Sequence, residues 1–302
     1  MIHSTDSSSK SGLQRWWLAI RPRTLPAAMS PVFVGIAIAQ TVKPVDPIPA
    51  VVILICAVLM QILANLVNDV ADFQKGTDTS GRLGPTRVTQ SGLLKPRQVW
   101  TGAIFTALTA MTGGIYLATI GGLPVIIMGA AAILSAVLYT VGPFSLEDHG
   151  LGDLFALIFF GFVAVCGTTW ILAGTLPILC WVGGLTMGCL ITGILVVNNV
   201  RDMDSDRKAG RRNIPTRFGR RAGEIEYTIM LLIAFLVLPA AWGLGWANTW
   251  ILLPWLAVPR AYQLWHMMRT LPPEPGFNHL LAMTAQLTLI YAILFSVAVV
   301  FN

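Results

Sequence analysis

The chain has 302 residues, of which 55% are hydrophobic and 11% charged, with a formal net charge of +6. Soluble domains carry about 25% charged residues, so this composition excludes a soluble globular protein and indicates an integral membrane protein. The first segment, MIHSTDSSSKSG, is polar and too long before the first apolar run to be a signal peptide. We expect 1–12 to be a disordered tail and 1–302 to form a single membrane-embedded domain.

Nine stretches are apolar and long enough to cross a bilayer, whose hydrocarbon core of about 30 Å needs about 20 helical residues. They cover approximately 24–41, 49–67, 99–120, 123–140, 152–172, 176–197, 227–246, 249–268 and 279–301. Short Gly/Pro turns join the third to the fourth and the fifth to the sixth, which favours two helical hairpins. The alternating pattern of membrane β-barrel strands is missing from the sequence. We therefore predict an all-α, polytopic helical bundle of about nine transmembrane helices around a central cavity.

Lys and Arg are unevenly distributed between the connections, which predicts the orientation of the chain. With nine helices, the N-terminal tail, the second–third loop and the sixth–seventh loop all lie on one side and carry most of the basic residues. The loops of the opposite side carry only Lys43. The basic side is expected to be cytoplasmic, so we predict a multi-pass protein of a bacterial inner membrane with a cytoplasmic N-terminus and a cytoplasmic site.

The second apolar stretch ends in polar and acidic residues, within the segment NDVADFQKGTD. Polar side chains recur there at steps of three and four, which places them on one helical face. They are Gln61, Asn65, Asn68, Asp69 and Asp72. Polar groups inside a span usually face the protein interior or a watery cavity. Asn65 alone is equally consistent with a contact between helices.

The sixth stretch ends in a similar group, within VNNVRDMDSDRKAGRRN. Asn198, Asp202 and Asp206 are spaced there by four residues. Asn198 follows Asn68 by 130 positions, and Asp202 follows Asp72 by the same 130. Because both helices end on the same membrane side, the repeat indicates two duplicated halves that face each other across a cavity.

Carboxylates at this density repel one another unless cations neutralise them. Flanking Lys and Arg supply part of the positive charge, and a hard divalent cation with oxygen ligands would supply the rest. Mg²⁺ typically takes one or two carboxylates together with substrate phosphates. The pattern thus indicates a Mg²⁺–diphosphate site at the cavity mouth, where basic loops hold phosphate oxygens. A hydrophobic tail would enter the apolar cavity below.

The sequence resembles the UbiA superfamily of intramembrane aromatic prenyltransferases, which carries N-D-x-x-D on helix two and D-x-x-x-D on helix six. Here the motifs read NDVAD, from Asn68 to Asp72, and DMDSD, from Asp202 to Asp206. Many members have a third aspartate four residues after the second, where this chain has Gly76 and places Asp78 two positions later. The segments RPRTLP, YTVGP, GLGDLFALIFFG and VNNVRDMDSDRKAGRRN are similar to the branch that acts in menaquinone synthesis.

This resemblance covers nearly the whole chain and implies a reaction. A prenyl group would pass from polyprenyl diphosphate to 1,4-dihydroxy-2-naphthoate, with loss of CO₂ and diphosphate. Two Mg²⁺ ions would bridge the diphosphate to the two motifs. The metal ligands would come from Asn68, Asp69, Asp72, Asp78, Asp202 and Asp206. The residues expected to contact diphosphate are Arg21, Arg23, Lys75, Arg82, Arg87, Lys208 and Arg212.

Catalysis is expected to depend on Asn68, Asp72, Asp202 and Asp206, together with Tyr139. The resemblance implies that Tyr139 faces the allylic cation, where an aromatic face stabilises positive charge; an interfacial anchor is the alternative. For each basic residue, the alternative is a purely topological role. Asp153 either caps the fifth helix or has a catalytic role. Glu147 and Asp148 lie in the same loop, and the sequence leaves open whether either is near the naphthoate.

Other functions fit the sequence less well. A different acceptor, such as 4-hydroxybenzoate or haem, is disfavoured by the displaced third aspartate and the GLGD segment, whereas a phytyl donor stays open. A transporter would also carry intramembrane carboxylates, but such sites tend to lie near the midplane on broken helices. The expected partners are the prenyl diphosphate, the naphthoate and the lipid bilayer, with no nucleic acid.

Overall fold

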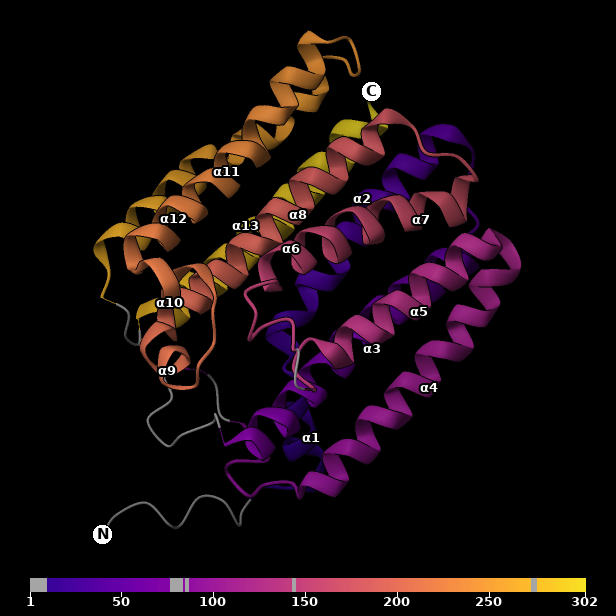
Figure 1. The fold of residues 1–302 in the computed structure, drawn as a ribbon. Helices are drawn as coiled ribbons and strands as arrows, with labels where there is room; N and C mark the ends of the chain where they lie inside the picture. The colour runs from indigo at the N-terminus through magenta and orange to yellow at the C-terminus, as the bar shows by residue number, and fades with distance from the viewer. Residues whose placement is uncertain (1–9, 77–83, 85–86, 143–144, 273–275) are drawn as a thin grey trace.

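The structure, a computed structural model, describes residues 10–76, 84, 87–142, 145–272 and 276–302. Within this part of the chain all regular elements are helical (Figure 1). The first half contains α1 (Gly12–Ile20), η1 (Pro22–Thr24), α2 (Leu25–Val42), α3 (Pro47–Lys75), α4 (Pro96–Gly121) and α5 (Leu123–Leu138). The second half contains α6 (Gly152–Ala156), η2 (Leu157–Val163), α7 (Ala164–Ala173), α8 (Ile178–Arg201), α9 (Met203–Lys208), α10 (Ile214–Phe218), α11 (Arg220–Gly243), η3 (Thr249–Ala257), α12 (Val258–Thr270) and α13 (Gly276–Val300).

The predicted membrane bundle is confirmed. Seven helical stretches of the described residues are long and apolar enough to span a membrane, beginning with 12–42, which joins α1, η1 and α2. Two further helical stretches coincide with predicted spans: α5, which is apolar but shorter, and η3–α12 at 249–270. The latter starts as a 3₁₀ helix that contains Pro254, a residue that cannot donate to an α-helical ladder.

Several helices continue past the apolar stretches that predict them. α3 ends at Lys75 and α8 ends at Arg201. The polar residues that follow each apolar stretch are still part of the helix. Gly76 then ends α3 in the left-handed conformation, with φ of 69°. The extra turns matter because they hold the first acidic motif on a rigid helix rather than on a loop.

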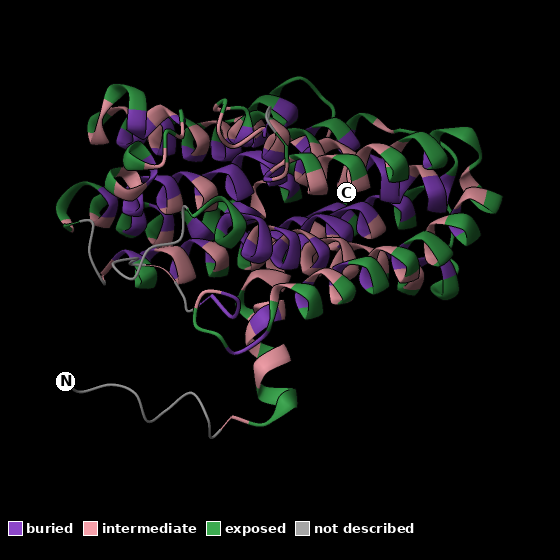
Figure 2. Ribbon diagram, turned by 60° about the horizontal axis from the view of Figure 1, so that its bottom comes forward, coloured by how far each residue is buried: buried purple, intermediate pink, exposed green. Residues whose placement is uncertain are grey.

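α8 lies at the centre of the bundle. In its most apolar stretch of 18 residues 78% are buried, whereas 22% are buried in the corresponding stretch of α4. Figure 2 shows the buried residues gathered on the inner helices. It packs against α11, η2 and α13. Contact with η2 is close because small residues face each other: a Cβ on Gly161 would overlap the Gly184 carbonyl oxygen. The helix that carries the second acidic motif is therefore fixed on several sides.

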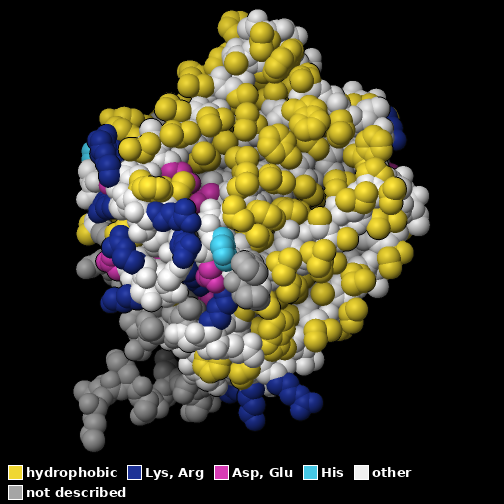
Figure 3. Space-filling model, in the orientation of Figure 1, with side chains coloured by type: hydrophobic (Ala, Val, Ile, Leu, Met, Phe, Trp, Pro, Cys, Tyr) yellow, Lys and Arg dark blue, Asp and Glu magenta, His cyan; other side chains and the backbone are white. Residues whose placement is uncertain are grey.

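The two ends of the bundle differ in charge. On the face shown in Figure 3, hydrophobic side chains cover most of the surface, and Lys, Arg, Asp and Glu gather mainly around α9 and α10. The C-terminus lies at the opposite end (Figure 1), where Asn248, after α11, donates to the Asn302 carbonyl oxygen over 3.1 Å. The described chain therefore begins and ends at opposite ends of the bundle. Of the tail expected at 1–12, residues 1–9 lie outside the described part, and Ser11 caps α1.

Candidate active site

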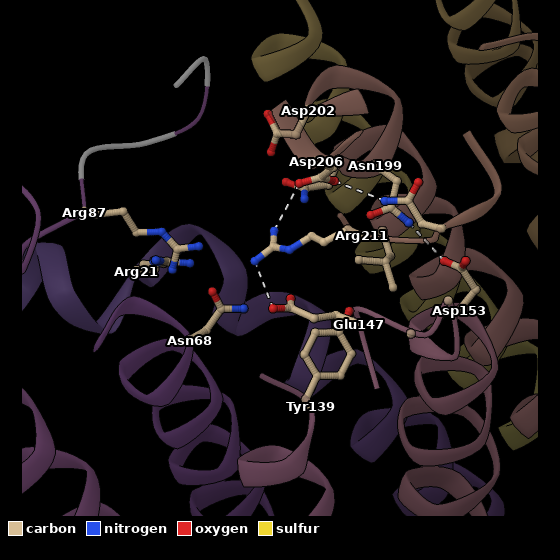
Figure 4. A pocket seen from close by; sticks show the side chains of 15 residues that line it. Arg21, Asn68, Arg87, Tyr139, Glu147, Asp153, Asn199, Asp202, Asp206 and Arg211 are labelled. Carbon is tan, nitrogen blue, oxygen red and sulfur yellow. Dashed lines mark hydrogen bonds and ion pairs between the residues drawn. The ribbon is translucent and has the colours of Figure 1, made fainter. Parts of the chain in front are cut away.

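A small polar cavity lies at the charged end of the bundle, with a volume of about 100 Å³. Its walls come from α3, the end of α5, the 145–153 segment, α8, α9 and the loop that follows α9 (Figure 4). Both acidic motifs contribute, through Asn68 on α3 and through Asp202 and Asp206. Segments far apart in the sequence thus meet at one place.

Arg211 connects the two motifs. Its Nη2 lies 2.5 Å from Asp72 Oδ1 and its Nη1 lies 3.1 Å from Asp206 Oδ1. The same Nη2 donates to Glu147 Oε1 over 2.9 Å. Figure 4 shows this guanidinium between Asp206 and Glu147. The other oxygen of Asp72 accepts from Arg87 Nη2 over 2.7 Å. Asp72 and Asp206 therefore face each other across a shared cation.

The turn after α9 explains how Arg211 reaches this position. Gly210 has φ of 81°, its N–H bonds to the Arg207 carbonyl, and the Arg211 N–H bonds to the Asp206 carbonyl over 3.0 Å. This pair of bonds is the Schellman arrangement, which requires a left-handed residue and favours glycine. It turns the chain back so that Arg211 lies beside the last turn of α9, next to the Asp206 side chain.

Burial and charge shift the ionisation of the loop residues. Burial raises the pKa of the Glu147 carboxyl to about 8; Arg211 opposes the rise, and the negative charge of Asp72 adds to it. Burial also raises the pKa of Asp206, against the lowering influence of Arg211. Burial alone would lower the pKa of Arg211, but Glu147 and Asp72 outweigh it and raise that pKa. Arg211 therefore stays charged at neutral pH.

Asp202 has its own cation. Its Oδ1 and Oδ2 accept from Arg201 Nε and Nη2 over 2.8 and 2.6 Å, the paired geometry that strengthens arginine–carboxylate contacts. The Arg201 Nη2 also donates to Asn198 Oδ1 over 2.6 Å. The helix breaks at Asp202 between α8 and α9, yet the Asp206 N–H still bonds to the Asp202 carbonyl over 2.8 Å. Asp204 points away and its side chain is 81% exposed.

Asp69 contacts backbone rather than the cavity. Its two oxygens accept from the N–H groups of Val88 and Thr89, both over 3.0 Å, and Arg21 Nη2 lies 3.6 Å from Oδ2. These bonds hold the end of the second–third loop against α3. In this arrangement Asp69 positions the loop that carries Arg87.

Asn68 provides a test of whether the site fits a metal ion. Its Oδ1 is buried, lines the cavity and accepts no hydrogen bond from the described residues. A buried acceptor without a partner is costly, and an amide oxygen is an acceptable Mg²⁺ ligand. Together with the facing carboxylates of Asp72 and Asp206, it makes a donor set that fits a hard cation. Among the described residues, however, no group of three or more His, Cys, Asp or Glu side chains converges as a ready metal site.

The other predicted residues lie at different depths. Arg21, Arg87 and Tyr139 line the cavity. Lys75 Nζ lies outside it and bonds to Asp148 Oδ2 over 2.7 Å. The exposed predicted residues are Arg23, Lys75, Lys208 and Arg212. Asp78 and Arg82 lie outside the described residues.

Three polar side chains of the cavity were not singled out from the sequence: those of Arg211, Asn199 and Asn213. Asn213 Nδ2 donates to Asp206 Oδ2 over 3.1 Å, and Asn199 Nδ2 donates to Asp153 Oδ1 over 3.3 Å. Of these three, Arg211 alone had a usable signal in the sequence. Gly210 is typical of a glycine that ends a helix and turns the chain back, which places the next residue, Arg211, beside the aspartates of that helix. The asparagines carry no charge pattern that would distinguish them.

The fold and the site together define the class of protein. It is a polytopic helical membrane protein whose polar cavity opens at the charged end, where paired carboxylates, an amide oxygen and several guanidiniums converge. Such a site suits an anionic group that arrives with a hard metal ion.

The chain belongs to the UbiA prenyltransferase family, whose family model matches residues 28–279. A similar curated relative is the 1,4-dihydroxy-2-naphthoate octaprenyltransferase of Escherichia coli, 34% identical, with 87% of this chain and 88% of the relative covered. Among solved structures, an apo UbiA homologue of Aeropyrum pernix has a TM-score of 0.70 at 14% identity, covering 93% of this chain and 98% of that one. A UbiA homologue of Archaeoglobus fulgidus bound to DMAPP and Mg²⁺ has a TM-score of 0.66 at 14% identity, covering 94% and 99%.

Proposed function

We propose that this protein transfers a prenyl group from polyprenyl diphosphate to 1,4-dihydroxy-2-naphthoate, releasing diphosphate and CO₂ and giving a demethylmenaquinol. The observation that carries the proposal is the meeting of Asp72 and Asp206 at one guanidinium beside the cavity. The name of the Escherichia coli relative, matched over most of both chains, supports the naphthoate as acceptor.

The two motifs would hold two Mg²⁺ ions, one near Asn68 and Asp72 and one near Asp202 and Asp206. The solved homologue with DMAPP and Mg²⁺ supports this choice of metal. When bound, Mg²⁺ supplies positive charge that favours departure of the diphosphate. The protein's own contribution is to hold the carboxylates at the ends of α3 and α8 and on α9.

Basic residues would complete the diphosphate site. Arg21 and Arg87 line the cavity on the side of Asn68 (Figure 4), where their guanidiniums can donate to phosphate oxygens. Lys75 is held by Asp148 at the edge of the site. Lys208, Arg212 and Arg23 are exposed, and we assign them to attracting the anion from a longer distance.

The acceptor and the cationic prenyl carbon would meet on the side of Tyr139 and Asp153. Gly152 lets Tyr139 lie close, because a Cβ there would come within 2.7 Å of the Tyr139 hydroxyl. The Tyr139 ring would stabilise positive charge that develops on the prenyl group. Loss of CO₂ from the attacked carbon then restores the aromatic ring of the naphthoate.

We also propose a bacterial inner membrane location with the charged end and the N-terminus in the cytoplasm. The gathering of basic residues at that end supports it. The site would then open toward soluble Mg²⁺, while the prenyl chain stays in the hydrocarbon region.

Expression in a bacterial strain without its own naphthoate prenyltransferase tests the function. Mass spectrometry of the extracted quinones should show menaquinone restored by the chain and by Asp204→Asn, but not by Asp202→Asn. Purified protein should discriminate against 4-hydroxybenzoate. Turnover of that acceptor at a comparable rate, with no naphthoate product, would replace this proposal by a different aromatic prenyltransferase.

A further inference from the structure

We propose that Arg211 is an internal counter-ion that holds the metal position in the free enzyme and gives it up only when metal and diphosphate arrive together. The proposal rests on the proposed function, since it assumes a diphosphate substrate. It makes Arg211 a positioning residue with two sets of partners: carboxylates before metal and diphosphate bind, and phosphate oxygens once they are bound.

The first support is the saturation of the motif carboxylates. Asp72 accepts from Arg87 and Arg211 at 2.7 and 2.5 Å. Asp206 is paired with Arg211 at 3.1 Å, and Asp202 is paired with Arg201 at 2.6 Å. Every one of these carboxylates therefore already faces a guanidinium.

The second support is electrostatic. The carboxylates of Asp72, Asp202 and Asp206 are all buried, so uncompensated charge there would be costly. Free Mg²⁺ entering alone would stand beside guanidiniums that already neutralise its ligands. Free diphosphate entering alone would face the same carboxylates. When Mg²⁺ and diphosphate enter together, their charges nearly cancel. Arg211 can then exchange a carboxylate for a phosphate oxygen at little electrostatic cost.

The third support is space. The cavity holds about 100 Å³, whereas small-molecule sites commonly measure about 300–1,000 Å³. Arg211 crosses the gap between Asp72 and Asp206, and no three carboxylate, His or Cys ligands converge within the described part of the chain. In the wall, Asn68 Oδ1 accepts no hydrogen bond from the described residues. Departure of the Arg211 guanidinium would enlarge the cavity and free one oxygen each of Asp72 and Asp206.

Arg211 has further contacts that can hold its side chain while it exchanges Asp72 and Asp206 for phosphate oxygens. Its guanidinium touches Glu147 at 2.9 Å and lies 3.8 Å from Asp148, both on the loop before α6. A side-chain rotation toward this loop would release Asp72 and Asp206 without moving the backbone. The backbone is in any case fixed on both sides of the side chain: Gly210 sets the turn, and a Cβ on Gly150 would overlap the Arg212 carbonyl.

The test measures metal binding without turnover. Purified protein in detergent, stripped of metal, is titrated with Mn²⁺ in the absence of diphosphate, and free Mn²⁺ is followed by electron paramagnetic resonance. Arg211→Met should bind Mn²⁺ at least about tenfold more tightly than the unsubstituted protein, because its ligands have lost their competitor. The control Arg212→Met removes the same charge from the neighbouring exposed position and should bind like the unsubstituted protein.

Equal Mn²⁺ affinities of the unsubstituted protein and Arg211→Met would overturn the proposal. So would equally tight binding by Arg212→Met, since the effect would then be one of net charge. If Arg211→Met does not fold, Arg211→Lys serves instead. Its single ammonium cannot bridge both aspartates, so it should show an intermediate affinity, and an unchanged one would overturn the proposal.

Thermal unfolding of the unsubstituted protein separates this inference from the function. Mg²⁺ alone and inorganic diphosphate alone should each change the melting temperature little, whereas both together should raise it clearly. A rise with Mg²⁺ alone as large as with both would contradict the counter-ion role. No rise with both would contradict the diphosphate function itself, while the Mn²⁺ comparison would still decide what Arg211 does.

Discussion

Replacing Asp206 by Asn should remove most of the activity while leaving a folded protein. The side chain is 8% exposed and contacts Arg211 and Asn213, each at 3.1 Å. Asparagine keeps the shape and one acceptor oxygen but loses the negative charge that would hold Mg²⁺ as diphosphate departs. Stabilisation that is realised only in the transition state affects kcat more than substrate binding. By analogy with removal of one oxyanion donor, the loss should be about 10²-fold or more.

Asp204→Asn is the matched control within the same motif. The Asp204 carboxylate is 81% exposed and has one ion pair, at 3.8 Å from Arg207 Nη1. An exposed pair of this kind contributes about 0–1 kcal/mol, so we expect a change of less than about fivefold.

The assay is product formation at saturating prenyl diphosphate and naphthoate, with size-exclusion profiles and circular dichroism as checks of folding. The double variant with Asp202→Asn should be little worse than the worse single one, because both residues serve one ion. If Asp204→Asn were as damaging as Asp202→Asn while Asp206→Asn had no effect, the assignment of ligands four residues apart would be wrong.

Three further predictions concern the parts of the fold that place the site. Gly210→Ala and Gly174→Ala each force a side chain into a left-handed helix cap with open space around it, so each should cost about 1–2 kcal/mol of stability. Only Gly210→Ala should also raise the KM for prenyl diphosphate, and equal KM values for the two variants would show that the turn does not place Arg211. Gly161→Leu should destabilise the protein by about 1–3 kcal/mol through overlap with α8, whereas Gly129→Ala, in open space on α5, should be neutral or slightly stabilising in thermal unfolding. A cysteine introduced at Asn302 should be labelled only from the non-cytoplasmic side, and labelling from the cytoplasm alone would refute the nine-pass topology.

Hydropathy predicted the bundle well because each helix that contacts lipid must be apolar over a fixed length. It predicted helix ends less well, since the last turns of α3 and α8 are polar and leave the hydrocarbon region while keeping their backbone hydrogen bonds. The π-helical η2 was not predictable either. It contains Gly161, which approaches α8 closely, and this tertiary contact has no local sequence signal.

The acidic residues of the site could be found from spacing alone, because steps of three and four select one helical face. Their partners could not. Arg211 and Arg212 are adjacent in a basic loop, and the sequence gives both the same charge. The turn at Gly210 and the packing of Gly150 against the Arg212 backbone send one side chain into the cavity and leave the other exposed. Similarly, the pairing of Asp69 with the Val88 and Thr89 N–H groups depends on how a loop folds back onto α3.

The most direct measurement of the central claim uses purified protein, a polyprenyl diphosphate, Mg²⁺ and naphthoate labelled in its carboxyl carbon. We predict that labelled CO₂, diphosphate and prenylated naphthoquinol appear in equal amounts, and that a chelator abolishes all three. A prenylated product that retains the labelled carboxylate, or release of diphosphate without any prenylated naphthoate, would contradict the account.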